Sequence, residues 1–153
     1  MTLAAGILYA AQSVLAGDAD FSAQKTMIQA HAGASQLAPE NTLAAFRAAK
    51  AAGADGFETD VRMTKDQCLV IHHDDSIDLT SDGQGNISDM TLAELKQLDF
   101  GAWFGPEFEG ERILTLEECL SAAKDLDFEI VNLELKPVVI NSEDGEPAAD
   151  GTL

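Results

Sequence analysis

Three acidic residues occupy positions from which they could hold a divalent cation together. In GFETDVRM, which alternates like a β-strand, Glu58 and Asp60 are two residues apart and therefore share one face. In VNLELKP, Glu134 and Lys136 share a face in the same way. Neighbouring carboxylates repel unless positive charge lies between them, and a third carboxylate at a second strand end would complete an all-oxygen set suited to Mg²⁺ or Ca²⁺. The spacing leaves open a second interpretation, in which two amphipathic strands turn their polar faces to water.

Two histidines also lie where apolar strand runs end, and they could exchange protons with a bound substrate. His31 follows IQA, and His73 follows LVIH. Imidazoles titrate near neutral pH, so one ring could take a proton while the other gives one. His72 must point to the opposite face from His73, so we expect it to face the core or a helix. Asp74 directly follows His73 and could orient or tune a nearby histidine.

The hydrophobic pattern supplies the elements that would position these side chains. Short apolar runs between turn residues predict strands, and a Ser or Thr cap before apolar residues at helical spacing predicts a helix. Thr91 with Glu94, and Thr115 with Glu118, have the spacing of a capping box. The expected elements are strands within 27–30, 55–64, 67–75 and 128–137, with a short turn around 65–67, and helices from Asn41 or Thr42 to about Ala52, from Thr91 to Leu98 and from Thr115 to Leu126.

The order of these elements predicts an α/β fold with a parallel sheet and crossover connections. Four strands and three helices are fewer than a complete (β/α)8 barrel contains, since such a barrel takes about 250 residues. The chain has 153 residues, enough for one domain with a real core. The pattern is therefore that of a smaller α/β domain or of part of a larger one.

Charge limits the classes of partner. Nine Lys and Arg against 27 Asp and Glu give a net charge of −18, which repels phosphate backbones and anionic lipid heads. We therefore expect no nucleic-acid partner. Hydrophobic residues make up 46% of the chain, which is typical of globular proteins. Cys68 and Cys119 lack zinc-type spacing and are expected to be buried free thiols, which leave the redox compartment open.

The termini differ in composition from the centre of the chain. Residues 1–26 are an N-terminal lead-in or a signal segment, because 3–16 is apolar and ends in small residues, although no Lys or Arg precedes it. A signal remnant in 1–16 would imply a secreted or periplasmic protein, and an amphipathic lead-in helix a cytoplasmic one. The expected domain occupies 27–140, and 141–153 is an acidic tail or loop.

Several separated motifs carry a family resemblance. They are HAGASQLAPENTLAAF, GADGFETDV, TKDQCLVIHHD, GNISDMTLAELKQLDFG, ILTLEECL and NLELK, in this order and spacing. Together they cover roughly 27–136 and resemble the glycerophosphodiester phosphodiesterase family. The resemblance implies a TIM-type (β/α)8 barrel with a small inserted segment and a site at the carboxyl ends of its strands. The chain would be the N-terminal part of that domain, and so an incomplete barrel.

The resemblance also implies an activity. The family hydrolyses glycerophosphodiesters, which are small-molecule substrates of lipid and glycerol metabolism, to glycerol 3-phosphate and an alcohol. By position, His31 and His73 would be the general acid–base pair, and Lys136 would lie near the phosphate. The residues that would bind the divalent cation, Ca²⁺ or Mg²⁺, are Glu58, Asp60 and Glu134.

The chain departs from the family pattern at two arginines. Ala32 stands where the family usually has Arg after the first His, and Leu79 stands in DLT where the family usually has Asp-Arg-Thr. Each loss removes a planar donor suited to phosphate. These losses favour an alternative, in which the protein is a catalytically impaired relative that acts as a binding or assembly module. An incomplete barrel would also leave sheet edges uncovered, so we expect self-association.

Overall fold

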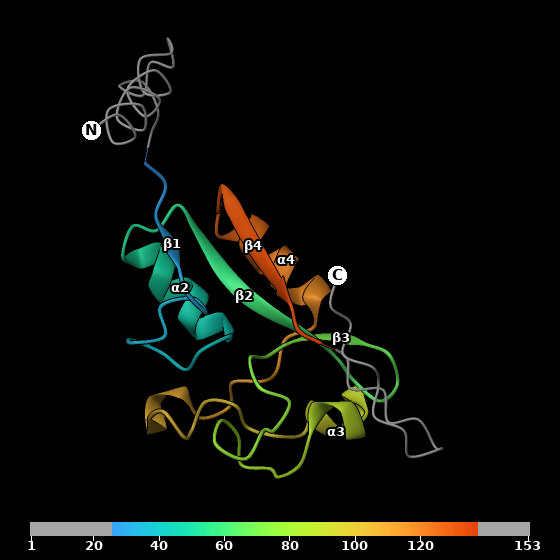
Figure 1. The fold of residues 1–153 in the computed structure, drawn as a ribbon. Coiled ribbons are helices and arrows are strands. Elements are labelled where there is room, and N and C mark those ends of the chain that lie inside the picture. Colours follow the sequence, from blue (N-terminus) through green and yellow to red (C-terminus); the bar gives the residue numbers. More distant parts are fainter. Residues whose placement is uncertain (1–25, 138–153) are drawn as a thin grey trace, which may run out of the picture.

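The computed structural model describes residues 26–137, which fold as a four-stranded sheet with helices packed on one face (Figure 1). Residues 1–25 of the expected lead-in and the whole expected tail, 141–153, lie outside the described residues. Within 26–137, no helix is long and apolar enough to cross a membrane. The elements in chain order are β1 (Gln29–Ala30), α2 (Leu43–Ala51), β2 (Gly56–Met63), β3 (Leu69–Ile71), the 3-10 turn η2 (Ile87–Asp89), α3 (Leu92–Leu95), the 3-10 turn η3 (Pro106–Phe108), α4 (Leu116–Asp125) and β4 (Ile130–Leu135).

Strand β2 is the centre of the sheet. It pairs in parallel with β1, where Ala30 faces Phe57, and in parallel with β4, where Asp60 faces Glu134. These three strands confirm the expected parallel sheet. The expectation is wrong for β3, which pairs antiparallel with the end of β2. The reason is length: a parallel crossover needs about a dozen residues or more, and only 64–68 connect β2 to β3.

The main core lies between the sheet and the helices α2 and α4. Phe46 of α2 stacks on Phe57 of β2 with ring centroids 4.0 Å apart, and Phe128 packs edge-on with Phe57 at a centroid distance of 5.0 Å. The same buried cluster contains Val61, Ile71, Cys119 and Ala123. Burying side chains of this size stabilises the fold by about 1.5–3 kcal/mol each. Since Phe57 and Val61 face the helices, the alternation of β2 turns Glu58 and Asp60 to the opposite face.

A second core orders the segment between β3 and α4, which corresponds to the expected insertion. In Figure 1 this segment lies at the end of the sheet where β1, β2 and β4 finish. Asp99 secures its loop by accepting hydrogen bonds from the backbone N–H groups of Gly101 and Ala102, both at 2.8 Å, and from that of Gly110. The buried apolar residues of this second core are Val70, Ile77, Ile87, Leu95, Phe100 and Ile113.

The helix caps agree with the sequence. Thr42, not Asn41, is the N-cap of α2, and its Oγ1 accepts from the N–H of Ala45 at 3.2 Å. Capping boxes form at Thr91 and at Thr115, as their spacing predicts. Each cap satisfies helix N–H groups that would otherwise lack partners, which contributes about 1 kcal/mol.

The two thiols differ from the expectation in one respect. Both cysteines are free, and Cys119 is fully buried, where burial raises the pKa of its thiol to about 12. Cys68 is half-buried, so its expected burial is wrong. Cys68 lies in the connection between β2 and β3, directly before the first residue of β3, and not in the strand itself.

Candidate functional site

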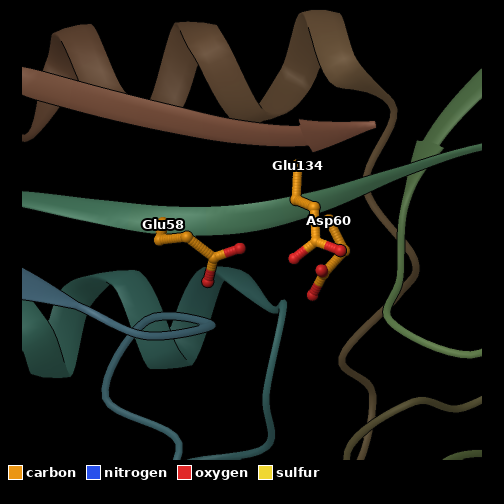
Figure 2. Close-up of side chains that lie close together, drawn as sticks. All are labelled: Glu58, Asp60 and Glu134. Carbon is orange, nitrogen blue, oxygen red and sulfur yellow. The ribbon is translucent and has the colours of Figure 1, made fainter. Parts of the chain in front are cut away.

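The three carboxylates that the sequence singles out meet at one place. Glu58 and Asp60 project from β2, and Glu134 is the register partner of Asp60 on the neighbouring β4. Figure 2 shows all three side chains directed to the same side of the sheet. One oxygen from each lies within 4.8 Å of the others. The parallel pairing of β2 with β4 thus brings Glu134 next to Glu58 and Asp60, which are two residues apart on β2, and the three acids form a compact cluster.

The carboxylates are unequally buried and incompletely paired. The Asp60 side chain is 1% exposed, that of Glu58 13% and that of Glu134 56%. Among residues 26–137, Glu58 Oε1 is buried without a hydrogen-bond partner, and Asp60 Oδ1 has only an ion pair. A buried carboxylate oxygen without a partner is costly. The donor set therefore fits a hard divalent cation, which would be bound by Glu58, Asp60 and Glu134.

Lys136 supplies positive charge to two of these acids. Its Nζ lies 3.0 Å from Asp60 Oδ1 and 2.5 Å from Glu134 Oε1. The hydrogen bond to Glu134 raises the pKa of Lys136; partial burial opposes this effect and the contact with Asp60 adds to it. The ammonium group therefore stays charged at neutral pH. It contacts oxygens that a cation would also use, so the two compete for them.

The turn after β1 holds the other oxygen of Glu58. His31 is 78% exposed, and its Nε2 lies 3.7 Å from Glu58 Oε2. The backbone N–H of Ala32 donates to the same Oε2 at 3.1 Å, with Ala32 in the left-handed region at φ 51°. Gly33 also has positive φ, and a Cβ there would lie 2.8 Å from the Cβ of Ala45. The turn can approach α2 this closely because Gly33 lacks a side chain.

Asn41 is a candidate site residue that sequence reasoning missed, because its position before an apolar helix indicates only a helix cap. It is 3% exposed, and its Nδ2 donates to Asp60 Oδ2 at 2.9 Å. Thr59 Oγ1 donates to Asn41 Oδ1 at 2.6 Å. Asn41 has φ 59°, a conformation that Asn tolerates better than most residues. An Asn immediately before a capping Thr was the available signal.

His73 lies in a different set of contacts. Its Nδ1 is 2.9 Å from Asp74 Oδ1, and its carbonyl oxygen accepts from Arg62 Nε at 2.8 Å. Asp74 therefore orients His73, as its position suggested. Among the described residues, the ion-pair partner of His73 within 4 Å is Asp74 and not a member of the carboxylate cluster. Direct contact thus connects His31, but not His73, to that cluster.

His72 faces the interior, as expected. It is 5% exposed and packs edge-on against Phe100. One ring nitrogen is 2.7 Å from the carbonyl oxygen of Asp74, and the other is 2.8 Å from Thr80 Oγ1. Burial, the largest effect, lowers the pKa of His72. The ring is therefore neutral, and its two hydrogen bonds hold the segment that follows β3 in place.

The two positions that depart from the family pattern have opposite environments. Ala32 is 2% exposed and is part of the turn beside Glu58. Leu79 is 83% exposed, in the segment after β3. A longer side chain at 79 would have free space, whereas one at 32 would have to leave a packed position.

Comparison with known proteins decides the family. The sequence profile of the glycerophosphoryl diester phosphodiesterase family matches residues 31–147. The chain belongs to this family. Over 116 residues it is 49% identical to a glycerophosphodiester phosphodiesterase of Caldanaerobacter subterraneus, a match that covers 76% of the chain and 47% of that relative. A putative glycerophosphodiester phosphodiesterase of Bacillus subtilis is 55% identical over 93 residues, 61% of the chain and 38% of the relative. The chain thus spans about half the length of the curated relatives it matches, or less.

Solved structures of related proteins confirm the fold class. An Oleispira antarctica phosphodiesterase, solved in complex with the product sn-glycerol-3-phosphate, is 45% identical, with a TM-score of 0.70 over 73% of this chain and 45% of that one. A glycerophosphodiester phosphodiesterase from Agrobacterium tumefaciens is 38% identical, also with a TM-score of 0.70, over 74% of this chain and 48% of that one. The described residues are therefore part of a TIM-type (β/α)8 barrel, with the candidate site at the carboxyl ends of its strands.

Proposed function

We propose that the protein hydrolyses glycerophosphodiesters to glycerol 3-phosphate and an alcohol, with a divalent cation, Ca²⁺ or Mg²⁺, as cofactor. The observation that carries the proposal is the cluster of Glu58, Asp60 and Glu134, in which Glu58 Oε1 has no hydrogen-bond partner within the described part of the chain and His31 lies beside Oε2. The names of the relatives support the reaction class, and the product complex of the Oleispira protein supports the class of substrate.

The cation would be held by the three carboxylates. When bound, it would neutralise charge and polarise the phosphoryl oxygens. A protein with a net charge of −18 otherwise repels a phosphodiester anion. Lys136 adds a second positive group at the same place. Its Nζ contacts the carboxylates of Asp60 and Glu134, and its pKa is raised, so the side chain carries its charge there. In this proposal the Lys136 ammonium binds the phosphate while the carboxylates bind the cation.

Two histidines would handle the protons. In hydrolysis, a water oxygen bonds to phosphorus as the bond from phosphorus to the alcohol oxygen breaks. One imidazole takes the proton of the attacking water and the other gives a proton to the departing alkoxide. His31 is exposed beside Glu58, so it can reach a substrate there. The hydrogen bond between Asp74 Oδ1 and His73 Nδ1 orients the His73 ring, so that its other nitrogen, Nε2, would be the one to exchange a proton with the substrate.

The second candidate is a binding or assembly module that retains the scaffold without turnover. Ala32 and Leu79 favour it, because each replaces a guanidinium that would hold phosphate. The oriented His73 favours an enzyme, because a histidine held in place for proton exchange is not needed to hold a ligand passively. The module would bind glycerol 3-phosphate or its diesters and release no alcohol.

A hydrolysis assay separates these functions. Several glycerophosphodiesters are incubated with the chain, with Ca²⁺ or Mg²⁺ and with EDTA, and alcohol release is measured. The same assay is run on a chimaera in which the Caldanaerobacter relative supplies the part of its length that the match does not cover. We expect cation-dependent release that Glu58→Gln lowers at least about 100-fold, in line with the loss of a ligand and its charge.

The matched control is Glu109→Gln, which neutralises an exposed carboxylate outside the cluster. It should leave the rate unchanged. Hydrolysis that survives EDTA would remove the cation from the proposal. Binding of glycerol 3-phosphate without alcohol release, in both the chain and the chimaera, would establish the binding module instead.

A further inference from the structure

Asn41 lies between the two parts of the candidate site. Its backbone N–H donates to the carbonyl oxygen of Ala32 at 2.9 Å, which ties it to the turn that carries His31. Its side chain reaches β2, where it contacts Asp60 and Thr59. The residue is buried and has φ 59°. One residue therefore connects the turn after β1 to the carboxylate on β2.

The contacts of the Asn41 amide fix its orientation. The Asp60 carboxylate can only accept, so the group 2.9 Å from its Oδ2 must be the Nδ2 donor. The backbone N–H of Asp60 can only donate, so the group 3.4 Å from it must be Oδ1. A flipped amide would place oxygen against oxygen and N–H against N–H. The Thr59 hydroxyl then donates to Oδ1 at 2.6 Å, which stabilises the same orientation.

This orientation of the Asn41 amide gives the two oxygens of Asp60 different partners. Oδ2 is occupied by Asn41, and Oδ1 is left on the side of Glu134 and Lys136. A carboxylate that was free to rotate could present either oxygen, or both, to a cation. Groups that hydrogen-bond to metal ligands orient them, and their loss typically lowers metal affinity about 10- to 100-fold.

We propose that Asn41, with its amide oriented by Thr59, is a positioning residue that directs Asp60 Oδ1 alone toward the divalent cation. This inference rests on the proposed function, because it takes Asp60 as a cation ligand. It assigns Asp60 a single coordinating oxygen. It also makes Thr59 act on the cation only through Asn41, since the Thr59 hydroxyl donates to the amide and not to the carboxylate.

Calorimetric titration of the full chain with CaCl₂, and separately with MgCl₂, tests whether the hydrogen bonds from Thr59 to Asn41 and from Asn41 to Asp60 affect cation binding. Asn41→Gly removes the amide and tolerates the positive φ, so it should weaken cation binding about 10- to 100-fold. Thr59→Val keeps the side-chain shape but loses the donor, and should weaken binding by a smaller factor, about 3- to 10-fold. Thr59→Ser restores a hydroxyl and should restore the affinity. Thermal unfolding of each variant shows that it is folded.

The double variant Asn41→Gly with Thr59→Val distinguishes positioning from general support. Because Thr59 acts through Asn41, the double variant should bind no more weakly than Asn41→Gly alone. Additive losses, or lowered melting temperatures with unchanged cation affinity, would overturn the inference.

Glu58→Gln is measured in parallel. If it weakens binding while the Asn41 and Thr59 variants do not, the inference fails and the proposed function stands. If the unsubstituted chain binds neither ion, or binds them with no effect of Glu58→Gln, the proposed cation site fails and this inference fails with it.

Discussion

At the scale of single residues, Glu58 shows how two elements share the control of one carboxylate. Strand β2 sets the direction of its side chain, while the turn after β1 supplies the Ala32 N–H and the His31 ring to Oε2. Oε1 is buried, and no residue that the structure describes forms a hydrogen bond with it. Because Ala32 contributes through its backbone, that hydrogen bond does not depend on the type of side chain, although a longer side chain must leave the packed position of Ala32.

Replacing Ala32 by arginine should therefore increase activity while Glu58 stays in place. A guanidinium beside His31 would add a charge-assisted hydrogen bond to phosphate, which contributes about 1.5–3 kcal/mol. Since about 1.4 kcal/mol is tenfold, we expect kcat/KM for a glycerophosphodiester to rise about 10- to 100-fold in Ala32→Arg. The measurement is steady-state hydrolysis by the chain and by the chimaera.

The control for this prediction is Ala32→Gln, which has a long polar side chain without charge. Because position 32 is buried, both variants must accommodate a larger side chain there, so their difference isolates the guanidinium. The gain should disappear in a His31→Ala background. If Ala32→Arg and Ala32→Gln have equal rates, phosphate is bound by another route.

At the scale of elements, strand alternation and helix capping could be predicted from the sequence because both depend on residues close together in the chain. The common face of Glu58 and Asp60 follows from the two-residue period of β2, and both capping boxes follow from a three-residue spacing. The role of Asn41 could not be predicted in this way. It depends on a positive φ at one turn and on a contact with Asp60, 19 positions further along the chain.

The antiparallel pairing of β3 was missed although its signal was present. A connection of five residues is too short for a crossover, whereas the alternation of strands and helices along the chain favours parallel pairing. The consequence matters for the site, because β3 ends where His72 and His73 begin the inserted segment. The position of His73 thus depends on this hairpin and on the contacts that hold the chain after it.

The buried His72 should make the stability of this region depend on pH. Burial lowers its pKa in the folded state, so the unfolded state binds a proton at higher pH than the folded state does. Stability from this residue is then constant above about pH 6.5, the ordinary value, and falls as pH drops from there toward the lowered pKa. The slope is at most about 1.4 kcal/mol per pH unit.

Urea unfolding of the unsubstituted chain and of His72→Gln, at several pH values between about 5 and 8, measures this effect on the free energy of unfolding. Glutamine cannot titrate but keeps polar groups for Asp74 and Thr80. The stability advantage of His72 should shrink as the pH falls below about 6.5. A difference that stays constant over the whole range would show that His72 does not titrate in this way.

At the scale of the whole molecule, the described sheet is open at both sides. Within residues 26–137, β1 and β4 each pair with β2 alone. Leu135 of β4 is 77% exposed, and Ile28, just before β1, is 60% exposed. In a closed barrel every strand has two neighbours, so β1 and β4 each lack one neighbour among the described residues. Unpaired strand edges favour association with another chain.

We therefore expect the 153-residue chain, prepared alone, to self-associate or to bind the dye ANS. The net charge of −18 opposes contact between copies, so association should increase as salt screens this charge. Leu135→Lys places a charge on the open strand and should reduce association. Leu37→Lys makes the same change at a residue that is 62% exposed in a loop, and should not. Light scattering at low and at physiological salt, with ANS fluorescence, measures both effects. A compact, monodisperse monomer that leaves ANS fluorescence unchanged would show that the open edges are covered within the chain itself.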